Sequence, residues 1–272
     1  MNMSSRYAHP LKLLMPMALI GALALTGCSA DVSTTGQNSD GAAERTITIA
    51  TSNDAPFSFT DAKTGNLSGI DGEMILAIAA EEGWNIEVFV TDFTTLIPAL
   101  MTEKADVIVD AMYITDARKE MINFTDTWYI QGEGMLVPAG STVTTRDDVK
   151  GLVLGAQTGT VFTDFIGTLG GSETQFFDSQ AALISAVENG QVDAAFTDSA
   201  VLAYSLVQKP NPKIELVTPY TPFFPGTIGA GVRMEDTELL ADLNAGLANL
   251  KKTPQYLEIL QKYGLGEDNV SE

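Results

Sequence analysis

The first candidate for chemistry is an arginine just past an apolar run. Residues 107–118 read VIVDAMYITDAR, and Arg118 closes this stretch in a chain with 15 basic residues against 35 acidic ones. The planar guanidinium of arginine donates two parallel hydrogen bonds to a carboxylate, which makes it a preferred partner for that group. The alternative is a surface ion pair with Asp116 or Glu120, which stabilises a protein by less than about 1 kcal/mol.

Two further positions could hold the rest of a small charged ligand. The stretch 157–160 reads QTGT, and its turn at Gly159 and Thr160 would offer backbone N–H groups and a hydroxyl to an anion. Asp198 ends another apolar run, where a buried carboxylate needs a cation such as a ligand ammonium. For both positions the alternative is a plain helix N-cap. Together, Arg118, Thr160 and Asp198 describe a receptor for a zwitterion.

Aromatic residues gather near the same predicted strand ends. They are Phe57, Phe93, Tyr113, Trp128 and Phe162. Most aromatic side chains of a soluble protein belong to its core, so two or three of the five are expected to touch a ligand. Their faces would sandwich the body of the ligand or lie against a cation.

The scarcity of other reactive side chains excludes several kinds of site. His9 is the only histidine and Cys28 the only cysteine, and both lie in the N-terminal segment. Ser-His-Asp sites, Cys-His sites and zinc sites built on these residues are therefore excluded, and no Walker-type loop is present. We expect no catalytic activity, no metal and no cofactor, although chemistry based on carboxylates alone remains possible.

The first 27 residues have the layout of a secretory signal. Arg6 and Lys12 precede an apolar stretch over 13–25 that is too short for a comfortable membrane span. Residues 25–28 (LTGC) resemble the lipobox of bacterial lipoproteins, in which the signal is cut before a cysteine that then carries the lipid. On this reading residues 1–27 are removed, and 28–45 form the lipidated Cys28 and a flexible tether. The alternative is an ordinary secretory signal with an incidental cysteine.

Removal of the signal would make the chain still more acidic. It takes away two basic residues and no acidic one, so the formal net charge of −20 becomes −22. This balance disfavours binding to nucleic acid or to anionic lipid headgroups. We therefore expect no nucleic-acid partner and contact with the membrane only through the lipid anchor.

The elements that must position these residues alternate along the chain. Strand-forming runs are expected at 46–51, 86–90 and 107–112, and helical patterns at 71–82 and 94–103, the first of them stopped by Gly83. A helical stretch over 236–263 should break near Thr253 and Pro254. Such alternation predicts an α/β fold with largely parallel sheets.

A weak internal repeat suggests two similar halves. Residues 96–106 and 183–193 match at a constant offset of 87, and each copy leads from an apolar helix through an aspartate into a strand. Two α/β lobes would each present the carboxyl ends of their strands, where open sheets bind ligands. Residues 110–118 would then line one wall of a site and residues 197–199 the other.

The order and spacing of several motifs resemble the extracytoplasmic solute-binding proteins of polar amino-acid ABC transporters, bacterial family 3. The resemblance covers residues 46–266. It rests on residues 55–57 (APF), 69–73 (GIDGE), 92–100 (DFTTLIPAL), 112–118 (MYITDAR), 124–126 (FTD), 157–160 (QTGT), 192–194 (VDA), 197–199 (TDS) and Tyr256.

The resemblance implies a two-lobed, type II periplasmic-binding-protein fold. Lobe 1 would comprise 46–127 plus 229–272 and lobe 2 133–222, with hinges at 128–132 and 223–228. It also implies a monomer, anchored outside the cytoplasm through Cys28, that closes on an amino acid or ectoine-like solute and delivers it to an ABC permease.

The family also implies roles for individual residues. Arg118 would bind the α-carboxylate with help from Thr160 in its Gly159 turn, and Asp198 the α-ammonium. Phe93 matches the aromatic clamp of the family, and Phe57 lies near its first-strand aromatic position.

This chain departs from the family at the end of the third expected strand. Many members have a small Thr or Ser after a Gly-Met pair, where this chain reads Ala111-Met112-Tyr113. Tyr113 would replace a small hydroxyl by a ring, as in some relatives that bind compatible solutes such as ectoine. Asp110 would favour a cationic ligand if it faced the cleft, but capping of the sheet edge is the favoured interpretation.

Two other functions fit the same scaffold. A periplasmic dehydratase related to these proteins would need a carboxylate acid/base in the cleft, for which Asp110 or Glu73 could serve. A ligand-sensing ectodomain would need a separate signalling partner.

Overall fold

The computed structural model describes residues 45–208, 210–223 and 225–271. The predicted signal peptide, Cys28 and the tether up to residue 44 lie outside the described residues. Within the described part, no helix is both long enough and apolar enough to cross a membrane.

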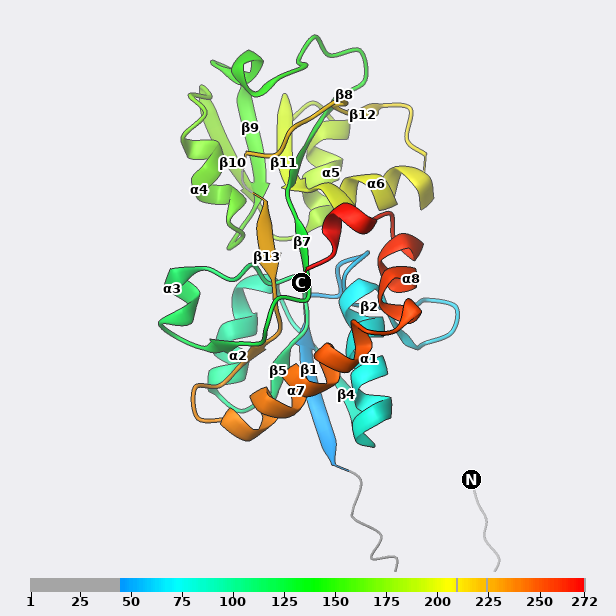
Figure 1. Ribbon diagram of the computed structural model, residues 1–272. Coiled ribbons are helices and arrows are strands. Elements are labelled where there is room, and N and C mark those ends of the chain that lie inside the picture. The colour runs from blue at the N-terminus through cyan, green and yellow to red at the C-terminus, as the bar shows by residue number, and fades with distance from the viewer. Residues whose placement is uncertain (1–44, 209, 224, 272) are drawn as a thin grey trace, which may run out of the picture. The chain divides into compact units, whose positions relative to one another are not determined.

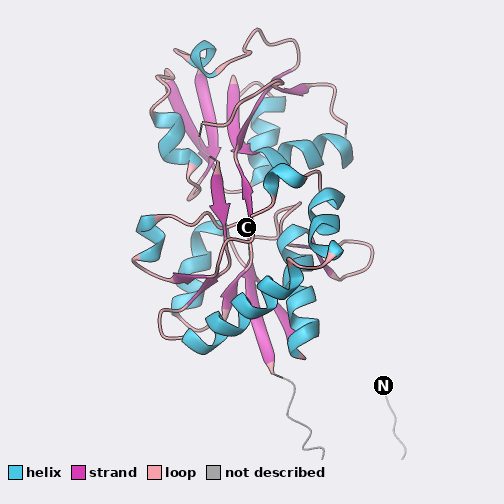
Figure 2. Ribbon diagram, viewed as in Figure 1, coloured by secondary structure: helices cyan, strands magenta, loops and turns pink. Residues whose placement is uncertain are grey.

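Strands and helices alternate along most of the described chain (Figures 1 and 2). The strands are β1 (Thr46–Thr51), β2 (Phe59–Thr60), β3 (Leu67–Ser68), β4 (Asn85–Val90), β5 (Val107–Ile108), β6 (Asn123–Phe124), β7 (Tyr129–Gln131), β8 (Glu133–Pro138), β9 (Val153–Gln157), β10 (Glu173–Phe177), β11 (Ala194–Asp198), β12 (Ile214–Leu216), β13 (Gly226–Ile228) and β14 (Gly231–Val232). The helices are α1 (Ile70–Glu82), α2 (Leu96–Met101), α3 (Asp116–Lys119), α4 (Phe162–Gly167), α5 (Gln180–Glu188), α6 (Ser199–Gln208), α7 (Thr237–Leu250) and α8 (Pro254–Lys262), with short 3₁₀ turns η1 (Phe93–Thr95), η2 (Arg146–Val149) and η3 (Glu267–Asn269).

The first sheet has five strands in the order β4-β1-β5-β14-β6. Strand β1 runs parallel to β4 and β5, and its β-branched residues Ile47 and Ile49 are buried. Helix α1 buries the apolar side chains that its sequence spacing predicted, and it ends at Gly83, whose φ of 70° gives the left-handed cap expected of glycine. The expected strand at 46–51 and the helix after it are therefore confirmed.

The second sheet also has five strands, in the order β10-β9-β11-β8-β12. Strand β9 is parallel to β10 and β11, whereas β8 is antiparallel to β11 and β12. Leu183 and Val187 of α5 are buried with the apolar residues of this sheet. Parallel strands at the centre of both sheets send their carboxyl ends to the side where ligands bind in such folds.

Two crossing strands, β7 and β13, connect the sheets. They pair antiparallel, with Gln131 opposite Gly226, Ile130 opposite Thr227 and Tyr129 opposite Ile228. The chain leaves the first sheet through β7 and returns to it through β13, and Figure 1 shows the pair between the two sheets. We call this pair, residues 129–131 and 226–228, the crossing ribbon.

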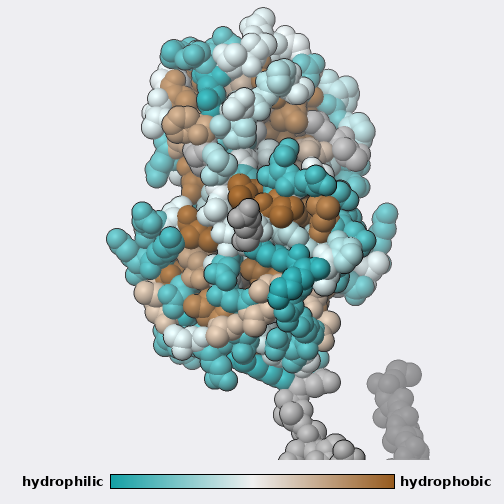
Figure 3. All heavy atoms as spheres, viewed as in Figure 1, coloured by the Kyte–Doolittle hydropathy of each residue, from teal (hydrophilic) through white to brown (hydrophobic). Residues whose placement is uncertain are grey.

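The C-terminal helices return to the first sheet. Helix α7 packs on α1 at Gly246, where an added Cβ would lie only 2.7 Å from Cγ2 of Ile78. The end of the chain then reaches the first crossing segment, where Asn269 and Ser271 donate hydrogen bonds to the carbonyls of Ile130 and Thr127, each of 2.8 Å. The face drawn in Figure 3 is largely hydrophilic, and its apolar side chains gather near the middle.

The internal repeat has a structural counterpart. The carboxylate of Asp106 accepts a hydrogen bond of 3.0 Å from the Thr48 N–H of β1, and the carboxylate of Asp193 accepts one of 2.8 Å from the Val153 N–H of β9. Both aspartates also donate their own N–H to the carbonyls of these residues. The two copies therefore make the same junction between a helix and a central strand.

Two expected elements differ in extent. The strand predicted over 107–112 is wrong beyond Ile108, because Ala111 adopts a positive φ of 48° while its N–H donates to the buried Asp71 carboxylate. The helix predicted over 94–103 begins as the 3₁₀ turn η1 and continues as α2. The break predicted near Thr253 and Pro254 is confirmed, because α8 starts at Pro254.

Candidate functional site

A cavity lies where the carboxyl ends of β1, β5, β9 and β11 meet. Its empty space, including the part that is open to solvent, is about 350 Å³, and the centre of a water molecule can reach about 20 Å³ of it. Its lining residues are Ser52, Asp54, Phe57, Phe93, Asp110, Ala111, Tyr113, Arg118, Gln157, Thr160, Val161, Phe162, Gln180 and Asp198. The cavity therefore brings together seven of the eight residues predicted to bind ligand, and the eighth, Gly159, touches Arg118 from beside it.

The guanidinium of Arg118 reaches from the first sheet to the second. Helix α3 begins at a Thr115 cap and carries Arg118, whose Nη1 donates to the Tyr113 carbonyl at 2.8 Å and Nη2 to the Gly159 carbonyl at 3.1 Å. The surface ion pair considered from the sequence is not formed, because Asp116 pairs with Lys119 instead. Burial lowers the pKa of Arg118 to about 10, so the side chain stays cationic at neutral pH.

Asp198 sits opposite at the last position of β11. Its Oδ1 accepts a hydrogen bond of 2.8 Å from Nε2 of Gln131, and the Tyr113 hydroxyl lies beside the carboxylate. Burial raises its pKa to about 7, an effect that the neighbouring Tyr113 hydroxyl opposes. No lysine or arginine lies within ion-pair distance of Asp198 in the described part of the chain, so a cationic ligand group would meet an unneutralised carboxylate.

The QTGT turn forms the wall on the second sheet. Gly159 has a φ of 79°, which a residue with a side chain rarely adopts, and this turn leads into α4. The Thr160 hydroxyl donates to the Gln157 carbonyl at 2.8 Å rather than pointing freely into the cavity. Thr160 lines the site as predicted, but in this structure its hydroxyl is engaged in the turn.

A chain of hydrogen bonds through three polar side chains runs behind that wall and ends at Asp54, next to the first sheet. The Thr197 hydroxyl donates to Gln180 at 2.7 Å, Gln180 to Gln157 at 2.6 Å, and Gln157 to the Asp54 carboxylate at 3.2 Å. The last of these bonds joins residues of the two sheets directly. Burial raises the pKa of Asp54, while its bonds with Gln157 and Ser52 oppose the rise.

Asp110 caps the edge of the first sheet, as the favoured interpretation of the sequence had it. Its carboxylate accepts from the Thr51 hydroxyl at 2.9 Å, from the Ser52 N–H at 3.0 Å and from the Ser52 hydroxyl. Burial raises its pKa to about 8; the Ser52 hydroxyl opposes this rise and the nearby Asp54 adds to it. Asp110 nevertheless lines the cavity, so it contributes to the acidic character of that wall.

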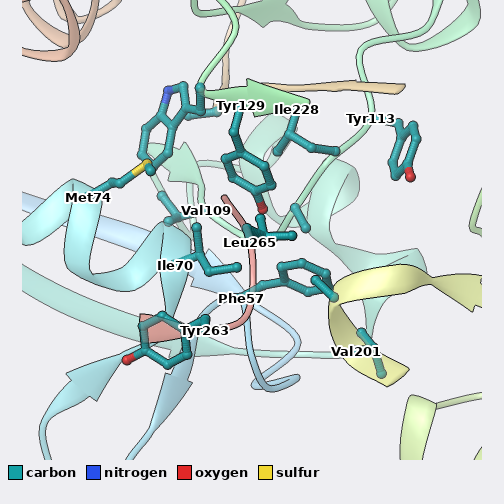
Figure 4. Close-up of a cluster of buried hydrophobic side chains, with 14 of the residues drawn as sticks. Phe57, Ile70, Met74, Val109, Tyr113, Tyr129, Val201, Ile228, Tyr263 and Leu265 are labelled. Carbon is teal, nitrogen blue, oxygen red and sulfur yellow. The ribbon is translucent and has the colours of Figure 1, made fainter. Parts of the chain in front are cut away.

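Four aromatic rings line the cavity. Cζ of Arg118 lies 5.6 Å from the centroid of the Phe93 ring. Tyr113 packs edge-to-face on Phe162, with 5.8 Å between the ring centroids. Figure 4 shows Phe57 and Tyr113 with the buried side chains around them. Of the five aromatics singled out in the sequence, Trp128 is buried elsewhere and does not line the cavity.

The chemistry of this donor set is that of a binding site for a charged organic molecule. No group of three or more metal-ligating side chains occurs in the described residues. The cavity offers one guanidinium, carboxylates at three positions and two amides, framed by aromatic rings. Such a set can hold a carboxylate and one or more cationic groups at once.

The prediction from the sequence did not include five polar residues that lie at the cavity or contact Asp198: Ser52, Asp54, Gln157, Gln180 and Gln131. Gln157 stood within a quoted motif, and Asp54 stood beside one, so both carried a signal. Gln131 did not, because its bond to Asp198 joins positions 67 residues apart and depends on how β7 crosses between the sheets.

Comparisons with known proteins show which family and which folds this chain is similar to. The model of the bacterial extracellular solute-binding proteins, family 3, matches residues 47–266. A probable histidine-binding protein of Neisseria gonorrhoeae is 30% identical over 89% of this chain and 91% of its own. An ancestral arginine-binding protein bound to glutamine superposes with a TM-score of 0.74 at 31% identity, covering 80% of this chain and 97% of that one.

A third relative bears on the enzyme alternative. An ancestral amino acid-binding protein, a precursor of cyclohexadienyl dehydratase, superposes with a TM-score of 0.72 at 29% identity over 80% of this chain and 96% of that one. The two-lobed α/β fold predicted from the sequence is confirmed by these similarities.

Proposed function

The chain belongs to the bacterial extracellular solute-binding proteins, family 3, and on that basis we propose that its cavity captures an amino acid or a related small zwitterion. Its role is that of the substrate-binding component of an ABC importer. The observation that carries the proposal is that Arg118, on α3 after the first sheet's β5, lines the same cavity as Asp198, which ends β11 of the second sheet.

The proposed contacts follow the charges of the site. Arg118 would exchange its carbonyl partners for the ligand α-carboxylate, with the Gly159–Thr160 turn closing over it. Asp198 would hold the α-ammonium, which supplies the cation that its burial demands. Phe93, Phe57 and Tyr113 would contact the body of the ligand, and Ala111 would give it a small neighbour at the strand end.

The capture step would be closure about the crossing ribbon. Lobe 1 would be residues 46–127 with 229–272, and lobe 2 residues 133–222, moving about hinges at 128–132 and 223–228. A ligand that bridges the two lobes binds the closed form better than the open form, so it shifts the population toward closure. We expect an affinity of about 1 μM, roughly −8 kcal/mol.

The side chain of the ligand would meet an acidic wall. Asp54 lies there without an ion-pair partner among the described residues, and a ligand cation would favour the ionised form of Asp110, whose pKa without ligand is about 8. Both residues favour a basic amino acid such as those named for the arginine- and histidine-binding relatives. The Tyr113 ring keeps an ectoine-like solute as a second candidate, because an aromatic face stabilises a delocalised cation.

Attachment to the cell surface would occur through Cys28. The relatives are periplasmic or extracytoplasmic, and the proposed chain would act there as a monomer anchored by lipid and delivering its ligand to a permease. Labelling of cells with a palmitate analogue should mark the full chain and not its Cys28→Ser variant. Equal labelling of both would contradict the anchor.

A dehydratase activity is the rival function on this fold, motivated by the likeness to the ancestral precursor. We propose that the chain is not an enzyme. Incubation with prephenate and arogenate should yield no product, and turnover that a Glu73→Gln or Asp110→Asn variant loses would contradict the proposal.

A calorimetric panel tests the binding function directly. The chain from residue 29 should be unfolded, freed of carried ligand, refolded and titrated with the twenty amino acids, ornithine and ectoine. We expect one or a few basic amino acids, or ectoine, to bind near the micromolar range. Heat only from sugars or metal ions would contradict the site assignment.

A further inference from the structure

One pair of opposite residues in the crossing ribbon contacts two side chains of the ligand site. Gln131 of β7 and Gly226 of β13 are direct partners in the antiparallel register. Gln131 is 2% exposed, so its amide points into the protein rather than into solvent. This single register position therefore joins the segments through which the chain passes between its two sheets.

From one side of this pair, Gln131 holds the proposed ammonium-binding carboxylate. Its Nε2 donates a hydrogen bond of 2.8 Å to Oδ1 of Asp198, and both side chains are buried. Asp198 lies on the second sheet, opposite Glu133 in the pairing of β11 with β8. The position of this carboxylate thus depends on the course of β7.

From the other side, Gly226 leaves room for the Tyr113 ring. A Cβ added at Gly226 would collide with Cε1 and Cδ1 of Tyr113. The ring is also tied to β13 through the backbone, because Tyr113 bridges to Ile228 and Ile114 donates to the Thr227 carbonyl at 2.9 Å. The Tyr113 hydroxyl lies beside Asp198, and the backbone carbonyl of Tyr113 accepts a hydrogen bond from Arg118.

We propose that Gln131 and Gly226 are positioning residues for the ligand site, which fix Asp198 and the Tyr113 ring from the two crossing strands and so couple ligand binding to the course of the crossing ribbon. This inference rests on the proposed function. The Tyr113 ring, seated on Gly226, also sets the width available to a ligand between Arg118 and Asp198.

The coupling follows from the geometry. If the two strands twist or shift relative to one another during opening, the Gln131 amide moves away from Asp198 and the wall behind Tyr113 moves with β13. A ligand gripped by Arg118 and Asp198 therefore finds both groups in place only in one arrangement of the ribbon. Affinity and closure should respond together to changes at this register pair.

A double-mutant cycle between Gly226 and Tyr113 tests the proposal, with calorimetric titrations of the compound that binds most tightly among the twenty amino acids, ornithine and ectoine. Gly226→Ala should weaken binding by about tenfold to a hundredfold, because the new methyl group displaces the ring. In the Tyr113→Ser background, which lacks the ring, the same change should cost less than about threefold. Gly226 does not have a positive φ, so alanine is compatible with its backbone.

Gly167→Ala is the matched control. A Cβ there would meet no atom within 4 Å, so this variant should keep its affinity within about twofold. Thermal unfolding is measured for the four proteins of the cycle: the unmodified chain, Gly226→Ala, Tyr113→Ser and the double variant. This measurement gives a second readout of the cycle where binding is too weak for calorimetry. The melting temperature should fall with Gly226→Ala in the presence of Tyr113 and much less in its absence.

Gln131→Met tests the other half of the pair, because methionine has a similar length but no amide donor. Binding should weaken about tenfold. Its pH midpoint should also move upward, since the ionised form of Asp198 then loses a hydrogen bond while Tyr113, Arg118 and Asp71 still face it.

The outcomes separate this inference from the proposed function. If the unmodified chain binds none of the twenty amino acids, ornithine or ectoine, the proposed function fails and the inference fails with it. If the unmodified chain binds but Gly226→Ala costs equally with and without the Tyr113 ring, only the inference is overturned. An unchanged pH midpoint in Gln131→Met would likewise overturn the positioning role of Gln131.

Discussion

At the scale of single residues, the site keeps two opposite charges apart. Arg118 donates to carbonyls and Asp198 accepts from an amide, so neither is neutralised by a direct ion pair among the described residues. Burying a charge without an opposite charge is costly, and a zwitterion would supply one opposite charge to each. The site therefore gains more from a ligand with two charged ends than from one with a single end.

The raised pKa of Asp198 predicts that binding depends on pH. Because its folded-state pKa of about 7 exceeds the ordinary 3.8, the neutral acid stabilises the unliganded fold fully below about pH 4, and that contribution is lost as pH rises through 7. A ligand ammonium needs the ionised carboxylate, so affinity should fall by up to about tenfold per pH unit below pH 7. Calorimetry between pH 5.5 and 8.5 measures this slope.

The matched control is Asp198→Asn, which cannot ionise at this position. It should bind weakly and lose the part of the pH dependence that Asp198 causes, so that any remaining slope comes from Asp110 and Asp71, which still titrate over this range. A flat profile in the unmodified chain would contradict the assignment of Asp198 to the ammonium.

The sequence predicted that Arg118 and Asp198 lie at one site, and both line the cavity, while their binding of a ligand stays a prediction. Arg118 was singled out because basic residues are scarce in this chain, and Asp198 because it ends an apolar strand. The bond between Gln131 and Asp198 could not be predicted, because nothing near Gln131 in the sequence indicates which strand it faces. The engagement of the Thr160 hydroxyl by its own turn is equally invisible before the backbone path is known.

At the scale of secondary-structure elements, periodicity predicted what local packing decides. The apolar spacing of α1 and the glycine at its end were sufficient to place that helix. The strand after Val107 was predicted too long, because a positive φ at Ala111 depends on a hydrogen bond to Asp71, which is 40 residues away. Tertiary contacts of this kind override local propensity.

The contact between α7 and α1 gives a prediction about stability alone. Gly246→Ala places a methyl group 2.7 Å from Cγ2 of Ile78 in a buried interface, so unfolding should become easier by about 1–3 kcal/mol. Ligand affinity should not change, since α7 contributes no residue to the cavity. Chemical denaturation and calorimetry measure the two quantities.

Ala248→Ser, on the exposed side of the same helix, serves as the control and should leave the free energy of unfolding within about 0.5 kcal/mol. Equal stability of Gly246→Ala and the unmodified chain would show that the two helices separate without cost.

At the scale of the whole molecule, the crossing ribbon is the part on which capture depends. It connects the two sheets whose strand ends supply the cavity, and the Arg118–Gly159 and Gln157–Asp54 bonds join those sheets across the site. The ligand would take over part of this bridging, because it offers stronger, charge-assisted bonds to the same groups.

Closure should be visible in solution. Small-angle X-ray scattering should show a smaller radius of gyration at saturating ligand than in its absence, because the ligand selects the closed form. Arg118→Ala at the same ligand concentration should keep the larger radius. Identical scattering curves with and without ligand would contradict hinge closure as the capture step.

The central claim is that Arg118 and Asp198 hold opposite ends of one zwitterion, and trimmed ligands test it most directly. The tightest amino acid of the panel, its α-amide and its N-acetyl derivative should be titrated into the unmodified chain, Arg118→Ala and Asp198→Asn. In the unmodified chain, each trimmed ligand should lose about 2–3 kcal/mol of binding free energy. The loss for the α-amide should vanish in Arg118→Ala, and the loss for the N-acetyl derivative should vanish in Asp198→Asn. Losses that stay the same in all three proteins would contradict the claim.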